Sequence, residues 1–288
     1  MILKNPRSLP ESIVRAVTGD PERRPEFGRL GVTDLIGPAY ARYLKVHHWD
    51  ELETEVENMA WMMLGQAFHH WMHIHAPEGT ISEEKIEIPF ENFTLSGIPD
   101  IVDGDTLYDY KVTSAWSFVY GDKPEWEAQL NVYRWMIWKV KSILVDKLSI
   151  VAIIKDFSAR KADKESDYPQ APIILIPVKV WDLDKTEDYI NERLKAHWQV
   201  HSCTPEERWR RADTWAVMKK GRKAALRVLD SEDDAKKWME ANGNKESYIE
   251  RRIGEDVRCG KYCAVAGVCE IKRERDGGGD VISGQAED

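Results

Sequence analysis

The segment at residues 97–111, GIPDIVDGDTLYDYK, restricts the fold more than any other part of this sequence. It contains four aspartates and one lysine, and Asp100 and Asp109 lie inside stretches that otherwise have strand composition. A carboxylate on a strand is costly unless a partner compensates its charge. The segment therefore predicts a β-hairpin that binds a cation or carries a catalytic group.

Regular patterns on both sides of this hairpin predict an α/β fold. Alternating polar and apolar residues predict strands at 83–90, 93–103 and 106–114, with a turn at Gly104 and Asp105. Apolar β-branched runs predict two more strands, at 147–157 and 173–181. Apolar residues at helical spacing predict helices at 51–75, 124–141 and 185–200.

The composition is that of a folded, water-soluble chain. With 288 residues, 42% of them hydrophobic, the chain can form one main domain with an appendage. The formal net charge of -9 argues against a protein that coats nucleic acid non-specifically, but it is compatible with a local basic channel. The sequence has no secretion signal and no apolar run near the roughly 18 residues of a membrane span, so we expect a cytoplasmic protein.

Changes in composition divide the chain into four expected parts. Residues 1–30, with several prolines and charges, are expected to form an irregular N-terminal arm, and residues 31–202 the core. The strongly charged residues 203–272 are expected to form a C-terminal extension of helical or irregular pieces. Residues 273–288, rich in glycine and acids, are expected to be a disordered tail.

The charged residues of the hairpin are expected to converge. Asp109 and Lys111 are two positions apart and share one face of their strand, and the turn brings Asp100 across from them. Two neighbouring carboxylates repel unless a divalent cation lies between them, and Mg²⁺ and Mn²⁺ prefer oxygen ligands. A lysine beside such an ion would position water and screen charge at a phosphate. The alternative is an exposed acidic hairpin in which Lys111 only pairs with an acid.

Four short motifs in order make the chain resemble a known family. They are GQAFHH at 65–70, GIPD at 97–100, DYK at 109–111 and QLNVYRW at 129–135. Over residues 30 to 200 the chain resembles the PD-(D/E)XK nuclease superfamily, in its RecB-like and phage-exonuclease branch. The resemblance implies a restriction-endonuclease-like core, in which helices flank a central mixed sheet, and metal-dependent hydrolysis of phosphodiesters.

The resemblance also implies roles for individual residues. By position, Asp100 and Asp109 match the two metal-binding acids and Lys111 matches the catalytic lysine. His69 matches the helical histidine that completes the metal site, and the backbone carbonyl of Tyr110 would be a further ligand. Because imidazole suits Mn²⁺ better than Mg²⁺, the histidine favours manganese as the activator.

The histidine-rich stretch HHWMHIH has two other interpretations. His69 and His73 are four residues apart on a helix and would form a zinc pair, but the zinc-protease pattern His-Glu-x-x-His is absent. A histidine on an apolar helix is also commonly a hydrogen-bonded core residue. The resemblance favours His69 as a ligand.

On the following helix, Gln129 and Tyr133 lie one turn apart and match a Gln-x-x-x-Tyr pattern of the family. We expect them to hold the lysine, the water or a DNA phosphate. The alternative is that Tyr133 packs in the core and Gln129 faces solvent. Trp116 and Trp126 are candidates to stack unpaired bases. Contact with DNA is expected from four basic residues, Lys123, Arg134, Lys155 and Arg160.

The C-terminal cysteines suggest a second metal centre. Cys259, Cys263 and Cys269 have Cys-x3-Cys-x5-Cys spacing, and Cys203 would supply a fourth thiolate if the chain folds back. Four thiolates suit a [4Fe-4S] cluster or zinc, and reduced unligated thiols are the third alternative. Iron-sulfur nucleases, which this segment resembles, usually have Cys-x2-Cys-x5-Cys and their remaining cysteine before the nuclease motifs, so the spacing and order differ here.

The function expected from the resemblance is that of a metal-dependent DNase, an exonuclease in particular. It would act in DNA recombination, end processing or phage replication, in the cytoplasm of a bacterium or a phage-infected cell. DNA is the expected partner, together with recombination or replication proteins; no membrane is involved, and the oligomeric state stays open. Two alternatives are a non-catalytic DNA-binding or assembly factor on the same fold and a zinc-stabilised interaction protein.

Overall fold

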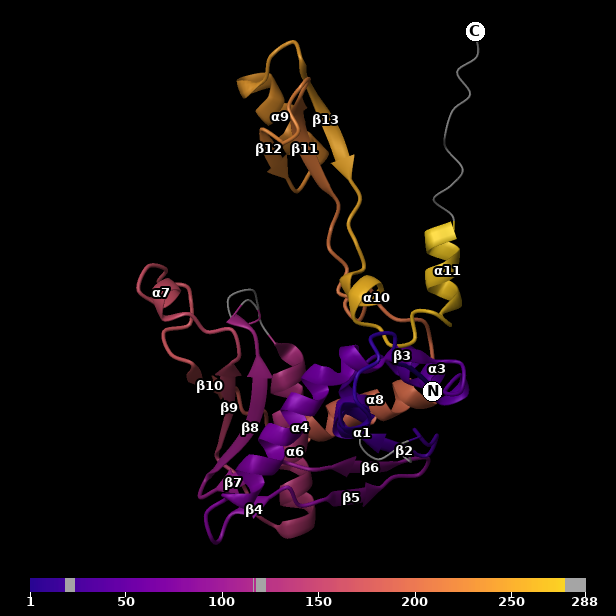
Figure 1. The fold of residues 1–288 in the computed structure, drawn as a ribbon, viewed down its shortest axis with the longest axis vertical. Helices are drawn as coiled ribbons and strands as arrows, with labels where there is room; N and C mark the ends of the chain where they lie inside the picture. The colour runs from indigo at the N-terminus through magenta and orange to yellow at the C-terminus, as the bar shows by residue number, and fades with distance from the viewer. Residues whose placement is uncertain (19–23, 116, 118–122, 278–288) are drawn as a thin grey trace. The chain divides into compact units, whose positions relative to one another are not determined.

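The computed structural model describes residues 1–18, 24–115, 117 and 123–277 and divides the chain into two compact units. Unit 1 is Met1–His201 and unit 2 begins at Ser202. Figure 1 shows the ribbon of both units. Among the described residues, no helix is long and apolar enough to cross a membrane.

Unit 1 is built on a five-stranded mixed sheet with the strand order β10-β9-β8-β7-β4. β8 and β9 pair in parallel, and the other neighbours are antiparallel. The side chains of Leu107 on β8 and Ile150 on β9 are fully buried, which places these strands in the core. The predicted α/β fold with a mixed sheet is confirmed. The strands are β4 (Ile81–Ser82), β7 (Ile101–Asp103), β8 (Thr106–Thr113), β9 (Lys147–Ile154) and β10 (Ile173–Val178).

The helix α6 (Pro124–Lys141) connects the two parallel strands and has the predicted bounds. Proline at the first helical position needs no intrahelical donor, and Lys139 and Lys141 suit the negative end of the helix dipole. Its middle turns bury large side chains, among them Trp135 and Ile137. α6 therefore forms the centre of the core of unit 1.

The predicted strand at 93–103 is wrong as a single element. It divides into β6 (Thr94–Gly97), which pairs with β5 (Ile86–Pro89) and β2 (Arg29–Gly31) in a separate three-stranded sheet, and β7, which belongs to the main sheet. Pro99 lies at the break and has no N–H to donate to a ladder. Asp100 consequently lies in a bend before β7, outside the strand.

The N-terminal residues are not the predicted irregular arm. β1 (Ile2–Lys4) pairs in parallel with β3 (Glu53–Glu55), and the helix α1 (Glu11–Thr18) buries Val17. The strand β2 buries Leu30, which is 1% exposed. Charged residues such as Lys4 and Arg15 belong to these elements, and the apolar Val17 and Leu30 are buried.

The remaining helices of unit 1 differ from prediction mainly at their starts. The predicted helix at 51–75 begins only at residue 60, because β3 and the 3₁₀ turn η1 (Val56–Met59) precede α4 (Ala60–Ile74). The predicted helix at 185–200 corresponds to α8 (Leu183–Trp198). The others are α2 (Val32–Ile36), α3 (Ala39–His47) and α7 (Ala159–Ala162).

Unit 2 contains a small sheet where helical or irregular pieces were expected. Its antiparallel order is β12-β11-β13, from β11 (Thr214–Lys219), β12 (Arg227–Leu229) and β13 (Ser247–Arg252). The helix α9 (Glu232–Asn242) starts at Ser231, whose hydroxyl accepts the N–H of Asp234. Residues 220–226, which include several basic side chains, connect β11 to β12 and are not helical.

The ends of this small sheet return to one place in unit 2, where a β-bridge joins Arg210 and Asp256. The chain then continues through α10 (Val257–Lys261) and α11 (Glu270–Gly277). Residues 273–277 therefore belong to a helix and not to the expected disordered tail. The rest of that tail, residues 278–288, lies outside the described residues.

Candidate metal and catalytic site

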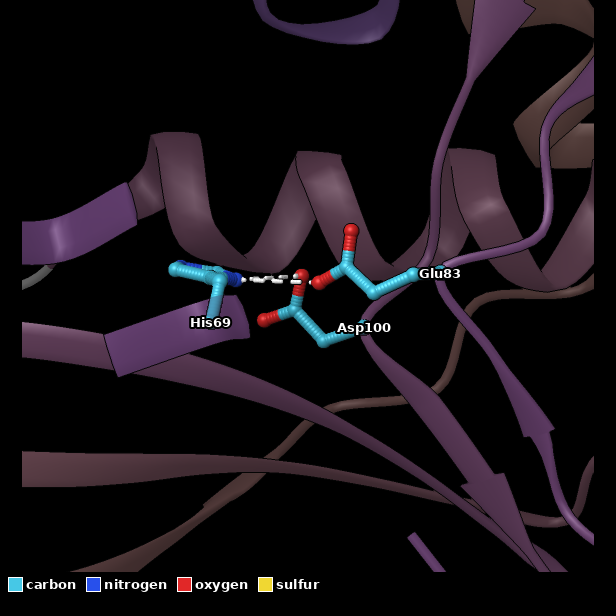
Figure 2. Close-up of side chains that lie close together, drawn as sticks. All are labelled: His69, Glu83 and Asp100. Atoms are coloured by element: carbon cyan, nitrogen blue, oxygen red, sulfur yellow. Dashed lines mark hydrogen bonds and ion pairs between the residues drawn. The ribbon is translucent and has the colours of Figure 1, made fainter. Parts of the chain in front are cut away.

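Three ligand-type side chains from different elements of unit 1 meet at one point. His69 of α4 places its Nδ1 3.2 Å from Oδ1 of Asp100 and 3.3 Å from Oε1 of Glu83. Figure 2 shows the imidazole directed at both carboxylates. The three ligand atoms lie within 4.8 Å of one another, close enough for a single ion to bind all three. The structure thus brings together the predicted His69 and Asp100 and adds Glu83, which was not predicted.

The backbone at Glu83 explains why its carboxylate reaches this point. Its φ is 51°, a left-handed conformation that is strained for a residue with a side chain. The N–H of Glu83 points at the carbonyl oxygens of Pro99 and Asp100, each 3.2 Å away. These contacts hold the Glu83 turn against the bend that carries Asp100, so the two carboxylates are positioned together.

The charges of this group favour a cation between the acids. The hydrogen bond to Asp100, and to a smaller extent the one to Glu83, raise the pKa of His69 to about 10, although burial opposes the charged form. In the metal-free protein the imidazolium therefore supplies the positive charge. Nitrogen and oxygen donors of this kind suit Mn²⁺ and Mg²⁺.

Asp100 is tied to the strand β8 through Tyr110. The backbone N–H of Tyr110 on β8 donates to Oδ2 of Asp100 at 2.6 Å, and Asp100 is only 6% exposed. The ring of Tyr110 meets the His69 ring edge-on, and burial raises the pKa of its phenol. The Tyr110 carbonyl as a metal ligand stays a prediction.

Asp109 and Lys111 lie on the same face of β8, with Lys111 Nζ 2.7 Å from Oδ2 of Asp109. Asp109 is 1% exposed, and burial raises its pKa to about 6 against the opposing effect of Lys111. Among the described residues, neither carboxylate oxygen accepts a hydrogen bond of good geometry. Buried oxygens in this state retain the capacity to bind an ion.

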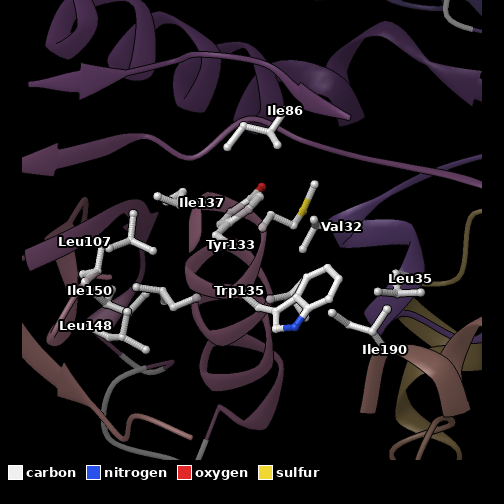
Figure 3. Close-up of a cluster of buried hydrophobic side chains, with 14 of the residues drawn as sticks. Val32, Leu35, Ile86, Leu107, Tyr133, Trp135, Ile137, Leu148, Ile150 and Ile190 are labelled. Atoms are coloured by element: carbon white, nitrogen blue, oxygen red, sulfur yellow. The ribbon is translucent and has the colours of Figure 1, made fainter. Parts of the chain in front are cut away.

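Gln129 of α6 also contacts Lys111, and Tyr133 of the same helix contacts Gln129. Lys111 Nζ donates to Oε1 of Gln129 at 3.1 Å, and Nε2 of Gln129 donates to the Tyr133 hydroxyl at 3.4 Å. Burial raises the pKa of Tyr133, so its phenol stays neutral. Figure 3 shows Tyr133 together with Trp135 among the core side chains. The Gln129 side chain is thereby fixed between the core and Lys111.

The four predicted DNA-contacting residues have different surroundings. Arg134 is 7% exposed, and its Nε donates to the Val145 carbonyl at 2.6 Å and its Nη1 to the Trp181 carbonyl at 3.2 Å. A buried guanidinium that bonds backbone carbonyls stabilises the core, so the expected DNA contact of Arg134 is not supported. Lys155 and Arg160 are exposed, and Lys123 Nζ lies 5.9 Å from the centre of the half-buried Trp126 ring. Trp116 lies outside the described residues.

The four cysteines all belong to unit 2, where they are half-buried and free. Burial, the charge of Glu207 and the other three thiols together raise the pKa of Cys203 to about 11. Among the residues that the structure describes, however, His69, Glu83 and Asp100 form the one group of three ligand atoms within 4.8 Å. The thiols are thus near enough to interact but are not arranged as ligands of one ion.

Comparisons with known proteins bear on this site. A search of curated proteins found no match. Among solved structures, the chain is similar to SSO0001, with 15% identity and a TM-score of 0.46 over 69% of this chain and 89% of that chain. It is also similar to an alkaline exonuclease (LHK-Exo) from Laribacter hongkongensis, with 11% identity and a TM-score of 0.35 over 60% of this chain and 89% of that chain. Both TM-scores are too low to carry weight.

A family profile provides the assignment. The profile of the PD-(D/E)XK nuclease superfamily matches residues 37–270, which include His69, Glu83, Asp100, Asp109, Lys111, Gln129 and Tyr133. The match covers well over half of the chain and extends into both units. The chain therefore belongs to the PD-(D/E)XK nuclease superfamily.

Proposed function

We propose that this protein is a divalent-metal-dependent deoxyribonuclease, and specifically an exonuclease of DNA recombination, end processing or phage replication. The observation that carries the proposal is the Asp109 and Lys111 pair on β8, linked through Tyr110 to the group of His69, Glu83 and Asp100. A scaffold that only bound DNA would gain nothing from burying Asp109 with a raised pKa.

The residues present fit a divalent ion. His69, Glu83 and Asp100 offer three ligand atoms, and the buried oxygens of Asp109 lack hydrogen bonds of good geometry within the described residues. We propose these four side chains as ligands, with the Tyr110 carbonyl as a fifth. When bound, the ion would polarise the scissile phosphate and lower the pKa of a coordinated water.

The protein's own groups would do the rest of the chemistry. The Lys111 ammonium would orient the attacking water and stabilise the charge that develops at phosphorus. Asp109 pairs with Lys111 at 2.7 Å, and the Gln129 amide oxygen accepts from its Nζ at 3.1 Å. The neutral Tyr133 phenol fixes Gln129 in turn. Phosphate contacts away from the reaction would come from Lys123, Lys155 and Arg160.

The decisive experiment measures cleavage of DNA labelled at its 5′ or 3′ end, single- and double-stranded, with Mg²⁺, Mn²⁺ or EDTA. Wild type and Lys111→Ala are compared, and a closed circular duplex serves as a substrate without ends. Metal-dependent loss of linear but not circular DNA, absent in the variant, supports the exonuclease proposal. Wild-type protein that is inert with every metal and DNA form contradicts it and favours a non-catalytic DNA-binding role.

We further propose an iron-sulfur cluster at Cys203, Cys259, Cys263 and Cys269. One support is that the other three thiols contribute to the raised pKa of Cys203. The other is that contacts hold the cysteine segments together: Arg208 Nη1 donates to the Cys203 carbonyl at 2.7 Å, and Arg208 also pairs with Asp256. Because each thiolate of a [4Fe-4S] cluster binds a different iron, such a cluster needs wider sulfur spacing than a single zinc ion does.

Iron, sulfide and zinc contents of anaerobically purified protein, with its visible absorption spectrum, test this proposal. The Cys203→Ser variant is the comparison. Iron and sulfide in equal amounts, with a broad visible band that weakens in the variant, support the cluster. One zinc per chain and no visible band support the zinc-stabilised alternative, and protein with neither metal leaves the cysteines as reduced thiols.

A further inference from the structure

The helix that carries His69 has an exposed apolar surface. None of the fifteen residues of α4 is fully buried, although most of them are apolar. Five large side chains on it are strongly exposed: Trp61 at 63%, Met62 at 45%, Leu64 at 40%, Trp71 at 60% and Ile74 at 54%. Grouped exposed apolar side chains of this size commonly mark a binding surface.

One end of this surface is paired with a lysine that directly follows β9. Lys155 Nζ lies 3.4 Å from the centre of the Trp61 ring. Lys155 itself is exposed, and among the described residues it forms no ion pair. A cation on one face of an indole leaves the other face and the ring edge free for a ligand.

The position of this pair relates it to the proposed reaction. Lys155 directly follows β9, and its N–H donates to the Thr113 carbonyl at the end of β8. Thr113 is two residues beyond Lys111 on the same strand, and α4 packs against β8. Trp61 and Lys155 thus lie in unit 1 near the C-terminal end of β8, the strand that carries the proposed catalytic Lys111.

We propose that Trp61 and Lys155 form a platform that binds an unpaired nucleotide next to the phosphate to be cleaved. The indole stacks on the base, and the ammonium pairs with a backbone phosphate. A base inside a duplex is stacked on its neighbours, so the platform favours single strands and frayed ends. This inference rests on the proposed nuclease function, because it assigns the form of DNA that this site accepts.

Binding of fluorescein-labelled oligothymidylate, followed by anisotropy in EDTA, tests the platform without cleavage. Trp61→Ala is expected to weaken binding about 5- to 100-fold, as the loss of one stacked base does, and Trp61→Phe less. Lys155→Gln is expected to lower the slope of log K against log salt by about 0.7. Trp71→Ala, equally exposed on the same helix, is the matched control and is expected to bind like wild type.

An oligomer with abasic sites separates stacking from other effects. If Trp61 stacks on bases, wild type and Trp61→Ala bind the abasic oligomer with the same affinity. Equal affinity of wild type and Trp61→Ala for the normal oligomer overturns the platform. Equal losses in Trp61→Ala and Trp71→Ala, with a change of oligomeric state in size-exclusion chromatography, overturn it too and identify the surface as a contact between copies of the chain.

The same data distinguish this inference from the proposed function. Wild-type protein that binds oligothymidylate through Trp61 but cleaves no DNA keeps the platform and removes the nuclease proposal. Wild-type protein that cleaves DNA and binds it independently of Trp61 keeps the nuclease proposal and removes the platform.

Discussion

The carboxylate of Asp109 and the ammonium of Lys111 lie 2.7 Å apart on one face of β8, but solvent reaches only the lysine, whose side chain is 23% exposed against 1% for the acid. Water thus has access to the donor, while its counter-ion is withdrawn into the core. The pair can therefore present a positive group to a substrate without exposing the carboxylate that stabilises it.

Replacement of Lys111 by alanine should abolish most of the hydrolysis. We expect the rate with Mn²⁺ to fall about 100- to 10,000-fold, the range for a group that assists proton transfer or stabilises charge in the transition state. Lys139→Ala, which removes a surface lysine 3.6 Å from Glu187, is the control and should cleave normally. Initial rates on labelled DNA give the answer, and similar losses in both variants would contradict a special role for Lys111.

Replacement of Asp109 by asparagine should stabilise the metal-free protein while it removes activity. Burial raises the pKa of Asp109 to about 6 from its ordinary 3.8, so its contribution to stability is full below pH 3.8 and is lost as the pH rises through 6. At pH 8 the buried charge costs about 1–3 kcal/mol, a cost that the neutral amide of the variant avoids. Thermal unfolding in EDTA at pH 8 should show a higher Tm for Asp109→Asn; a lower Tm refutes the prediction.

The Glu83 carboxylate should contribute to metal affinity although no motif marks it. We expect Glu83→Gln to weaken Mn²⁺ binding about 10- to 100-fold in isothermal titration calorimetry, the range for a group that supports a metal site. The neighbouring Glu84 pairs with Lys141 at 2.6 Å on the surface and provides the matched control Glu84→Gln. Equal affinities of the two variants would exclude Glu83 from the site.

Replacement of two glycines of the motifs, Gly97 and Gly65, by alanine should change the stability of the fold in opposite directions. A Cβ at Gly97 would lie 2.8 Å from Cε1 of Tyr133 and 3.0 Å from Cγ2 of Val32, whereas one at Gly65 meets nothing within 4 Å. We expect Gly97→Ala to lose about 1–3 kcal/mol of unfolding free energy by overpacking. Gly65→Ala should gain up to about 1 kcal/mol, because alanine favours helix. Urea unfolding measures both, and a stabilised Gly97→Ala would contradict the packing.

Stability should fall below pH 6.5 through His197. Its Nε2 bonds the Leu35 carbonyl at 3.2 Å, and burial lowers its pKa from the ordinary 6.5. The unfolded chain therefore takes up a proton at a higher pH than the folded chain, and stability is lost as the pH falls below about 6.5. Urea unfolding at pH 7.5 and 5.5 should show a smaller drop for His197→Gln than for wild type. The exposed His201→Gln should behave like wild type.

The sequence predicted the elements whose local and tertiary preferences agree. α6 has its predicted bounds because Pro124 favours its start and its apolar residues face the core. Asp109 and Lys111 meet as predicted because strand alternation alone places them on one face. In the charged segment 203–272, the helix α9 agrees with the expected helical pieces, but the strands β11 and β12 were not predicted, since they are short and the alternation in them is weak.

Other features depend on contacts that no local pattern records. The break at Pro99 sends β6 and β7 into different sheets, which only their partners determine. Glu83 reaches His69 because its backbone adopts a left-handed conformation against Pro99 and Asp100, and the neighbouring sequence gives no sign of this. Trp61 belongs to no motif in the sequence, and only its exposure and its lysine neighbour in the structure distinguish it.

The bridge between Arg210 and Asp256 has a consequence for how this chain can change. The segment 211–255 of unit 2 begins and ends at adjacent points, so its removal would need only a short linker between the residues that the bridge joins. Segments whose two ends lie side by side tolerate replacement by other segments, both in evolution and in protein engineering. The small sheet can thus be lost, lengthened or replaced by another module while Cys203 and Cys259 keep their separation.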